Sequence, residues 1–245
     1  MFSGFTRMLL PPIYSMLVYG ILGIGAGLLT VWITLRIEKQ SFASIGMVWE
    51  KKTIPKFLTG VLIGAAIFAV IISALISLTC LTVRYQPATL NLQFILVYLA
   101  VLPLALMEEI GFRSYPQIKL NNAYGVWASQ IVVAIAFGTY HILNGWSPYI
   151  AFTGPFVWAF VFGLAALKSG GIAMPTGIHF AVNVLQNIVG LKSGKGTVFK
   201  LDYPPGTTKA LMAATEKTGT ILQAVILAGA LLLTALYIKR IKHIA

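Results

Sequence analysis

Residues 57–83 read FLTGVLIGAAIFAVIISALISLTCLTV, an apolar run without a single charged side chain. The hydrocarbon core of a bilayer is about 30 Å thick and a helix rises about 1.5 Å per residue, so roughly 20 apolar residues are needed to cross it. The run is longer than this requirement. It is therefore predicted to form a transmembrane helix.

Six further runs of this kind occur, and the composition agrees with them. They lie near Ile13–Leu35, Leu90–Phe112, Ala123–Leu143, Tyr149–Leu167, Ile172–Leu191 and Thr220–Ile238. The mean hydropathy is +0.86, and only 10% of the residues are charged, against about 25% in soluble domains. We predict an all-α protein, a polytopic membrane helical bundle of about seven to eight transmembrane helices, in a single integral membrane domain over residues 1–245. An eighth helix would lie near residues 1–12 or 40–56.

The formal net charge of +12 is dispersed among the segments between these runs. In a membrane protein such residues set the orientation in the bilayer. Basic and aromatic residues do not alternate as in a nucleic-acid platform, which argues against nucleic acid as a partner. The single cysteine, Cys80, excludes an intrachain disulfide and a multi-cysteine metal site.

Charged side chains at the end of an apolar run are informative because they are costly in a membrane. Residues 102–115, LPLALMEEIGFRSY, contain Glu108, Glu109 and Arg113. Glu109 and Arg113 lie four residues apart and are expected to form an ion pair. Adjacent helical residues diverge by about 100°, so Arg113 cannot serve Glu108 from the same side. An unpaired, poorly solvated carboxylate attracts protons strongly, as a general base must.

Two other runs contain histidine. Phe137 and His141 are four residues apart in AFGTYHILNGW (136–146), and His179 and Asn183 are four apart in MPTGIHFAVNVLQN (174–187). A lone histidine on an apolar helix is usually a structural residue, satisfied by a backbone carbonyl or by a neighbouring helix. Two histidines, an asparagine and an unpaired glutamate on three helices together indicate a polar cavity.

These residue types suit the hydrolysis of a peptide bond. A glutamate and a histidine can take a proton from water, and a second histidine and an amide N–H can donate to the oxyanion that forms when the water attacks a carbonyl. Neither a G-x-S-x-G elbow nor H-E-x-x-H occurs, and Cys80 is remote in sequence from the cluster. Serine, cysteine and ordinary zincin mechanisms therefore lack their signatures.

The sequence resembles the CPBP family of CAAX proteases and bacteriocin-processing enzymes, also called the Abi family. EEIGFR (108–113) matches the pattern E-E-x-x-x-R, FGTYH (137–141) matches F-x-x-x-H, and HFAVN (179–183) matches H-x-x-x-N, in the family's order. The resemblance covers about residues 90–190, which would form a CPBP/Abi-like catalytic core. Ser114 stands where many members have glycine.

The resemblance implies a role for each matched residue. Glu108 and His141 would activate the water, His179 and Asn183 would stabilise the oxyanion, and Glu109, Arg113 and Phe137 would support the site. Glu108, His141 and His179 could alternatively hold zinc with an open position for water. We favour a metal-free, glutamate-type mechanism without a cofactor, because asparagine is a poor zinc ligand and a good oxyanion donor.

Three functions follow from these observations. The first is an intramembrane endopeptidase in the cell membrane of a prokaryote, with the lipid bilayer and a peptide or membrane-protein substrate as partners. The second is a non-enzymatic membrane scaffold or bacteriocin-immunity factor that keeps the polar cluster for folding or binding. The third is a proton-coupled transporter, which the apparent lack of inverted repeats disfavours.

The positions of Glu108 and His141 constrain the helices that carry them. In an antiparallel pair, residues near the ends of two consecutive helices would lie at opposite faces of the membrane. Either the helix of Glu108 continues toward Ile118, or the next helix begins near Trp127 or later. We expect the continuation, because RSYPQI (113–118) offers no break before Pro116 and membrane helices tolerate proline.

Overall fold

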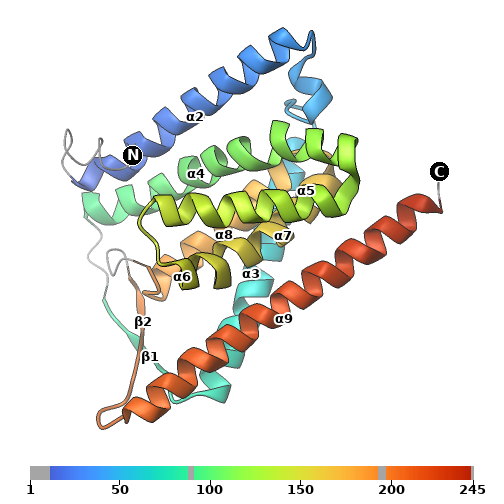
Figure 1. Ribbon diagram of the computed structural model, residues 1–245. Helices are drawn as coiled ribbons and strands as arrows, with labels where there is room; N and C mark the ends of the chain where they lie inside the picture. Colours follow the sequence, from blue (N-terminus) through green and yellow to red (C-terminus); the bar gives the residue numbers. More distant parts are fainter. Residues whose placement is uncertain (1–11, 88–90, 193–196, 244–245) are drawn as a thin grey trace.

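The computed structural model describes residues 12–87, 91–192 and 197–243, which form a bundle of helices (Figure 1). This confirms the predicted all-α membrane fold. The helices are α2 (Pro12–Ile37), the 3-10 helix η1 (Phe42–Ile45), α3 (Thr53–Leu78), α4 (Leu92–Arg113), α5 (Tyr115–Leu143), α6 (Pro148–Thr153), α7 (Pro155–Ser169), α8 (Ala173–Ile188) and α9 (Lys209–Lys242). Two short strands, β1 (Thr82–Tyr85) and β2 (Phe199–Asp202), complete the described elements.

Five stretches of the described chain are long and apolar enough to cross a membrane. They are Tyr14–Ile37, Thr53–Leu78, Leu92–Leu143, Pro148–Ser169 and Lys209–Lys242. The third stretch contains both α4 and α5. The 16 residues of α8 span only about 24 Å, less than the bilayer core. The predicted count of seven to eight is therefore not confirmed. Region 40–56 contains only η1 and the start of α3, and residues 1–11 lie outside the described residues.

The outer surface of the long helices is apolar, as contact with lipid requires. On α3, Leu62 and Val70 are 71% and 70% exposed, and on α9, Val225 and Leu232 are 62% and 61% exposed. Soluble monomers rarely expose a continuous apolar surface of this extent. The bundle therefore belongs in a membrane.

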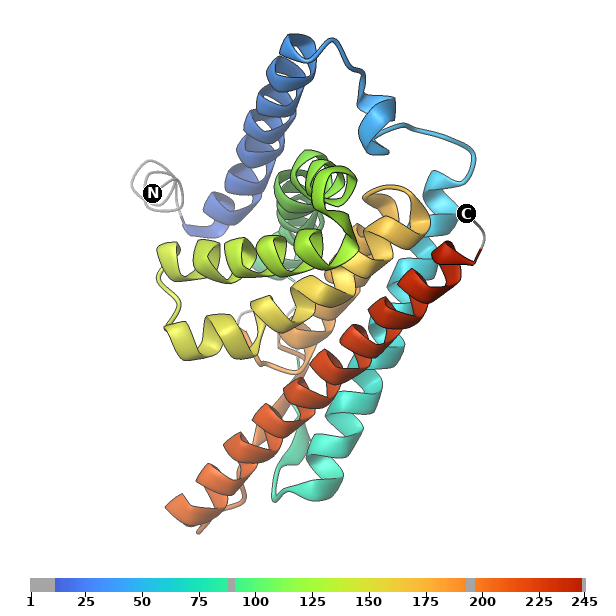
Figure 2. The same ribbon diagram turned by 45° about the vertical axis from the view of Figure 1, so that its right-hand side comes forward.

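The helices pack in pairs that are visible in two views of the molecule. In Figures 1 and 2, α2 lies along α4, while α9 runs obliquely across the bundle beside α3 and α7. The ends of α3 and α9 project beyond the other helices on the side where β1 and β2 lie. This arrangement leaves α4, α5, α7 and α8 at the centre, and α4, α5 and α8 carry the polar residues singled out above.

Glycines bring α3 and α8 into backbone contact. A Cβ added to Gly60 would lie 2.1 Å from the carbonyl oxygen of Met174, and one added to Gly64 would lie 2.7 Å from that of Ile178. From the other side, a Cβ on Gly177 would lie 2.1 Å from the carbonyl oxygen of Phe57. The spacing of Gly60 and Gly64 is the G-x-x-x-G pattern by which membrane helices approach closely. The position of α8 is thus set by α3.

The expected continuation of α4 toward Ile118 is wrong. The helix ends at Arg113, and Ser114 has a non-helical backbone with φ −82° and ψ −107°. Pro116 lies in the first turn of α5, where its missing N–H needs no helical partner, whereas in a continuous helix it would lose a hydrogen bond and clash with the preceding turn. α5 has a second break at Gly125, where φ is 82°. The part of α5 that carries His141 therefore begins near Trp127, which agrees with the alternative prediction that this helix starts near Trp127 or later.

The chain between α3 and α4 and the loop before α9 form a small sheet that the sequence did not indicate. β1 and β2 pair antiparallel, with Thr82 opposite Asp202 and Tyr85 opposite Phe199. The predicted helix over 57–83 consequently ends at Leu78. Because the strands are more than a hundred residues apart in sequence, no local turn signal predicts their pairing.

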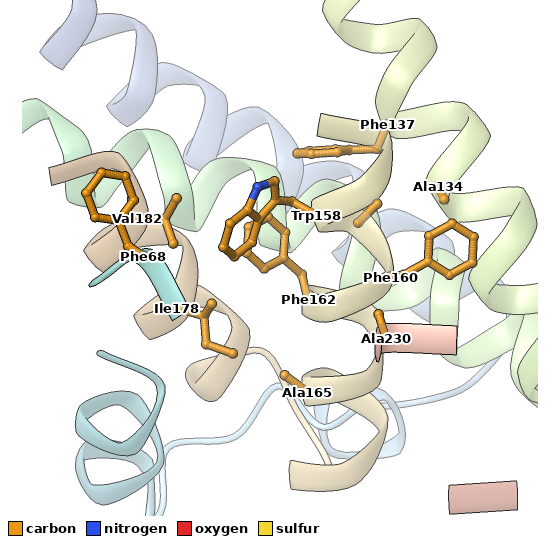
Figure 3. Packing of buried hydrophobic residues seen from close by; sticks show 11 residues of the cluster. Phe68, Ala134, Phe137, Trp158, Phe160, Phe162, Ala165, Ile178, Val182 and Ala230 are labelled. Atoms are coloured by element: carbon orange, nitrogen blue, oxygen red, sulfur yellow. The ribbon is translucent and has the colours of Figure 1, made fainter. Parts of the chain in front are cut away.

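The apolar core lies between α7 and α8 and their neighbours. Figure 3 shows Trp158 and Phe162 of α7 between Ile178 and Val182 of α8 on one side and Phe137 of α5 on the other. All five are at least 94% buried. Phe137 and Phe162 belong to this core and also line the cavity described next, so the core fixes one wall of the site.

Candidate active site

The two adjacent glutamates lie in the last turns of α4 and have different surroundings. Glu109 is completely buried, whereas the side chain of Glu108 is 15% exposed and lines a cavity. This is the divergence expected of neighbouring positions on a helix. The break after Arg113 keeps both carboxylates inside the bundle, a little more than one turn from the end of α4.

Glu109 connects two helices. Its Oε1 accepts a hydrogen bond from Arg113 Nη1 at 3.4 Å and one from His179 Nδ1 at 2.8 Å. The ion pair with Arg113 was predicted, and the contact with His179 was not. The Arg113 guanidinium is fully buried over the rings of Phe137 and Phe162, with its carbon 4.2 and 5.2 Å from their centroids. Glu109 and Arg113 thus hold His179 and the aromatic wall together.

His179 presents its second nitrogen to Glu108. Because a carboxylate only accepts, the short bond to Glu109 places a proton on Nδ1. Nε2 then lies 3.6 Å from Glu108 Oε2. The imidazole stacks on Phe162, with centroids 4.6 Å apart and planes 14° apart. Glu108 Oε2 is buried and has no hydrogen-bond partner among the described residues. Glu108 and His179 therefore lie side by side in the wall of the cavity.

His141 is held in one tautomer at the end of α5. Its Nδ1 donates to the carbonyl oxygen of Phe137 at 2.8 Å, since a carbonyl can only accept. Nε2 is left with a lone pair. Phe137, Tyr140 and Trp146 meet the imidazole edge to face, at centroid distances of 4.7, 5.3 and 5.1 Å. The ring is therefore fixed, and its basic nitrogen is available for chemistry.

Asn183 lies one turn after His179 on α8. Its Oδ1 accepts a hydrogen bond of 2.7 Å from Lys192 Nζ, a residue that the sequence interpretation did not include. A lysine ammonium has no acceptor, so the bonded atom of Asn183 must be its oxygen. The amide nitrogen of Asn183 is consequently the end that remains for another partner.

One cavity of about 440 Å³ is lined by Glu108, His141, His179 and Asn183 together with Phe137. The structure thus brings all four proposed catalytic residues to one space, while Glu109 and Arg113 support it from behind. Further lining residues that we had not singled out are Tyr19, Tyr140, Asn144, Gln186 and Lys192. Tyr19 and Tyr140 are hydrogen-bonded through their hydroxyls at 2.9 Å. The sequence contains two signals for these additional lining residues. Tyr140 directly precedes His141, and Lys192 comes just after α8.

The side chains as they lie do not form a zinc site. Among the described residues, no three His, Cys, Asp or Glu side chains are grouped so that they could hold a metal ion. The alternative set of Glu108, His141 and His179 therefore does not fit as arranged.

The protein is thus a helical membrane bundle whose internal cavity is lined by two histidines, a glutamate and an asparagine. This arrangement is the one expected of a hydrolase that is embedded in a membrane. Residues 87–185 match the family model described as type II CAAX prenyl endopeptidase Rce1-like. This confirms the resemblance to the CPBP family, and Glu108, His141, His179 and Asn183 all lie within the matched segment. The match supports an intramembrane endopeptidase of the CAAX type and indicates a peptide or protein substrate. Comparisons with curated proteins and with solved structures found no match.

Proposed function

We propose that the protein is an intramembrane endopeptidase in which Glu108 and His141 activate water without a metal ion. The observation that carries this proposal is the pair formed by Glu108 Oε2, which lacks a hydrogen-bond partner among the described residues, and His179 Nε2, 3.6 Å away in a cavity shared with His141 and Asn183. The proposed location is the cell membrane of a prokaryote.

In the first step, Glu108 accepts a proton from a water molecule whose second hydrogen is bonded to Nε2 of His141. The water oxygen attacks the carbonyl carbon of the scissile peptide bond, and the carbonyl electrons move to its oxygen. Nδ2 of Asn183 and an N–H at Nε2 of His179 donate to this oxyanion. Because Nδ1 of His179 already donates to Glu109, His179 donates to the oxyanion when its Nε2 also carries a proton.

In the second step, the tetrahedral intermediate collapses. The C–N bond breaks, and the leaving nitrogen takes the proton that Glu108 received. The products are a free amine and a carboxylic acid, so one water is consumed and the enzyme returns to its starting state. Glu108 acts as base and then as acid, the usual behaviour of a catalytic carboxyl group.

The test compares wild type with Glu108→Gln in liposomes. Membrane proteins from a strain that lacks the chain are added, and new peptide termini are identified by mass spectrometry. Wild type should generate termini that Glu108→Gln does not, because an amide cannot take the proton. Glu216→Gln is the matched control, since Glu216 is exposed on α9, outside the cavity.

Two outcomes would contradict the proposal. If neither protein generates new termini, the cluster serves a scaffold or immunity role rather than proteolysis, and if both generate the same new termini, Glu108 is not the catalytic base. If a chelator abolishes wild-type cleavage and zinc restores it, the metal-free mechanism is wrong although the protease function stands.

A further inference from the structure

The chain turns sharply after α8 and returns Lys192 toward the cavity. Gly190 has φ 73°, a conformation that favours glycine, and its N–H donates to the carbonyl of Asn187 at 3.1 Å. The N–H of Leu191 donates to the carbonyl of Gln186 at 2.9 Å. These bonds close the end of α8 and direct the Lys192 side chain back to Asn183, nine residues earlier.

The ammonium of Lys192 donates its hydrogen bond to an amide oxygen and not to a carboxylate. Among the described residues, Lys192 forms no ion pair, whereas four of the chain's six acidic residues, Glu38, Glu50, Glu109 and Asp202, are each paired with a lysine or arginine. The bond from Lys192 to the Asn183 oxygen decides which end of that amide faces the cavity.

The charge of Lys192 interacts electrostatically with Glu108 and His141. Desolvation of its ammonium by the surrounding protein lowers the pKa of Lys192 to about 8, although the residue as a whole is exposed and attraction to Glu108 opposes this change. His141 also lies within the range of its charge. Among the described residues that line the cavity, no other side chain is a lysine or an arginine. A positive charge in the wall of the cavity favours the build-up of negative charge on the oxygen of a bound carbonyl group.

We propose that Lys192 is a positioning residue, which holds the amide of Asn183 with its nitrogen toward the oxyanion. This inference rests on the proposed function. Without Lys192, rotation of the Asn183 amide by half a turn would present oxygen to the oxyanion and replace attraction by repulsion. The bond also polarises the amide, so its N–H groups become better donors. Lys192 lies beyond the segment that matches the family model, residues 87–185.

The first experiment measures cleavage by Lys192→Met and Lys192→Arg in the full-length protein. Methionine keeps an apolar side chain of similar length but removes the donor, whereas arginine keeps both donor and charge. Lys192→Met should lower kcat by about 10- to 100-fold with little change in KM, less than the roughly 100- to 1,000-fold effect of losing an oxyanion donor. Lys192→Arg should recover most of kcat. Lys209→Met, at an exposed site outside the cavity, should match wild type.

The pH profile and a double variant separate positioning from a structural effect. A group with a lowered pKa is charged below that value, so wild-type kcat should decline as the pH rises through about 8, and Lys192→Arg should not show this decline. In an Asn183→Ala background, Lys192→Met should cause a much smaller loss than in wild type, because the interaction that both substitutions remove is already gone and only the direct effect of the charge is left.

The second experiment needs no activity. The purified protein is treated with an amine-acylating reagent at several pH values, and the labelling of Lys192 is compared with that of Lys209 by mass spectrometry. Asn183→Ala should raise the labelling of Lys192 relative to Lys209, because the hydrogen bond that shields its nitrogen is gone.

The inference is overturned if Asn183→Ala leaves this ratio unchanged, or if Lys192→Met and Lys192→Arg have equal kcat. Either result leaves the proposed function standing as long as wild type cleaves and Glu108→Gln does not. Conversely, a wild type without any cleavage refutes the proposed function, and the labelling ratio still decides whether Lys192 holds Asn183.

Discussion

Glu109 and His179 show how far single residues could be interpreted from the sequence. The pair of Glu109 and Arg113 was predictable because a spacing of four residues places both on one face of any helix. The 2.8 Å bond from His179 to Glu109 joins positions 70 residues apart, and no periodicity contains that information. The family resemblance grouped these residues, but only the fold shows that one carboxylate orients the histidine while its neighbour faces the cavity.

Replacement of Glu109 should therefore damage both stability and chemistry. In Glu109→Gln, the buried Arg113 loses its anionic partner, and removing one member of a buried pair typically costs about 3–5 kcal/mol. His179 also loses the carboxylate that accepts the hydrogen bond from its Nδ1. We expect a lower unfolding temperature in detergent and a reduced kcat in the folded fraction.

The control for this prediction is Glu108→Gln, which should lose activity with a smaller change in unfolding temperature, because Glu108 lacks a direct ion pair with Arg113. A Glu109→Gln protein as stable as wild type, yet inactive, would exchange the roles assigned to the two glutamates.

At the level of helices, the apolar runs predicted where the membrane segments lie. They did not predict where the helices break or which helices contact each other. The boundaries of α4 and α2 agree with the predicted runs to within about two residues. The break at Ser114 was missed because Pro116 was treated as a residue that a membrane helix tolerates, although it serves better as the start of α5. The sheet of β1 and β2 joins distant segments, and the shortness of α8 is hidden in a longer apolar run.

The contact of α3 with α8 gives a prediction at this scale. Gly60→Ala places a Cβ 2.1 Å from the carbonyl oxygen of Met174, so the two backbones must separate. Overpacking of this kind costs about 1–3 kcal/mol. Because α8 carries His179 and Asn183, we expect both a lower unfolding temperature and a lower kcat.

Gly229→Ala is the matched control for this helix contact. Gly229 also lies within a long helix, α9, but its added Cβ would meet nothing within 4 Å. Alanine should be neutral or slightly stabilising there, because it favours the helix more than glycine does. Equal effects of the two substitutions would show that the close approach of α3 and α8 does not determine stability.

At the scale of the molecule, the structure places the site inside the bundle rather than at its rim. Glu108 precedes the end of α4 by five residues, which corresponds to about 7.5 Å along the helix. His141 can reach the same cavity because the breaks at Ser114 and Gly125 let the chain change direction before the second part of α5 begins. The composition predicted a membrane protein, but only these breaks explain how residues near the ends of two consecutive helices meet.

This depth predicts the order in which introduced cysteines react with a water-soluble thiol reagent. In a Cys80→Ala background, single cysteines replace Lys209 at the start of α9, Leu104 at the cavity wall, and Leu99, which is 56% exposed on the apolar side of α4. The reagent needs water, so Lys209→Cys should react fastest, Leu104→Cys more slowly through the cavity, and Leu99→Cys least in lipid. A substrate peptide should slow only Leu104→Cys. If Leu104→Cys reacts as fast as Lys209→Cys in intact membranes, the cavity is open to bulk water, and hydrolysis within the membrane is the wrong description of this site.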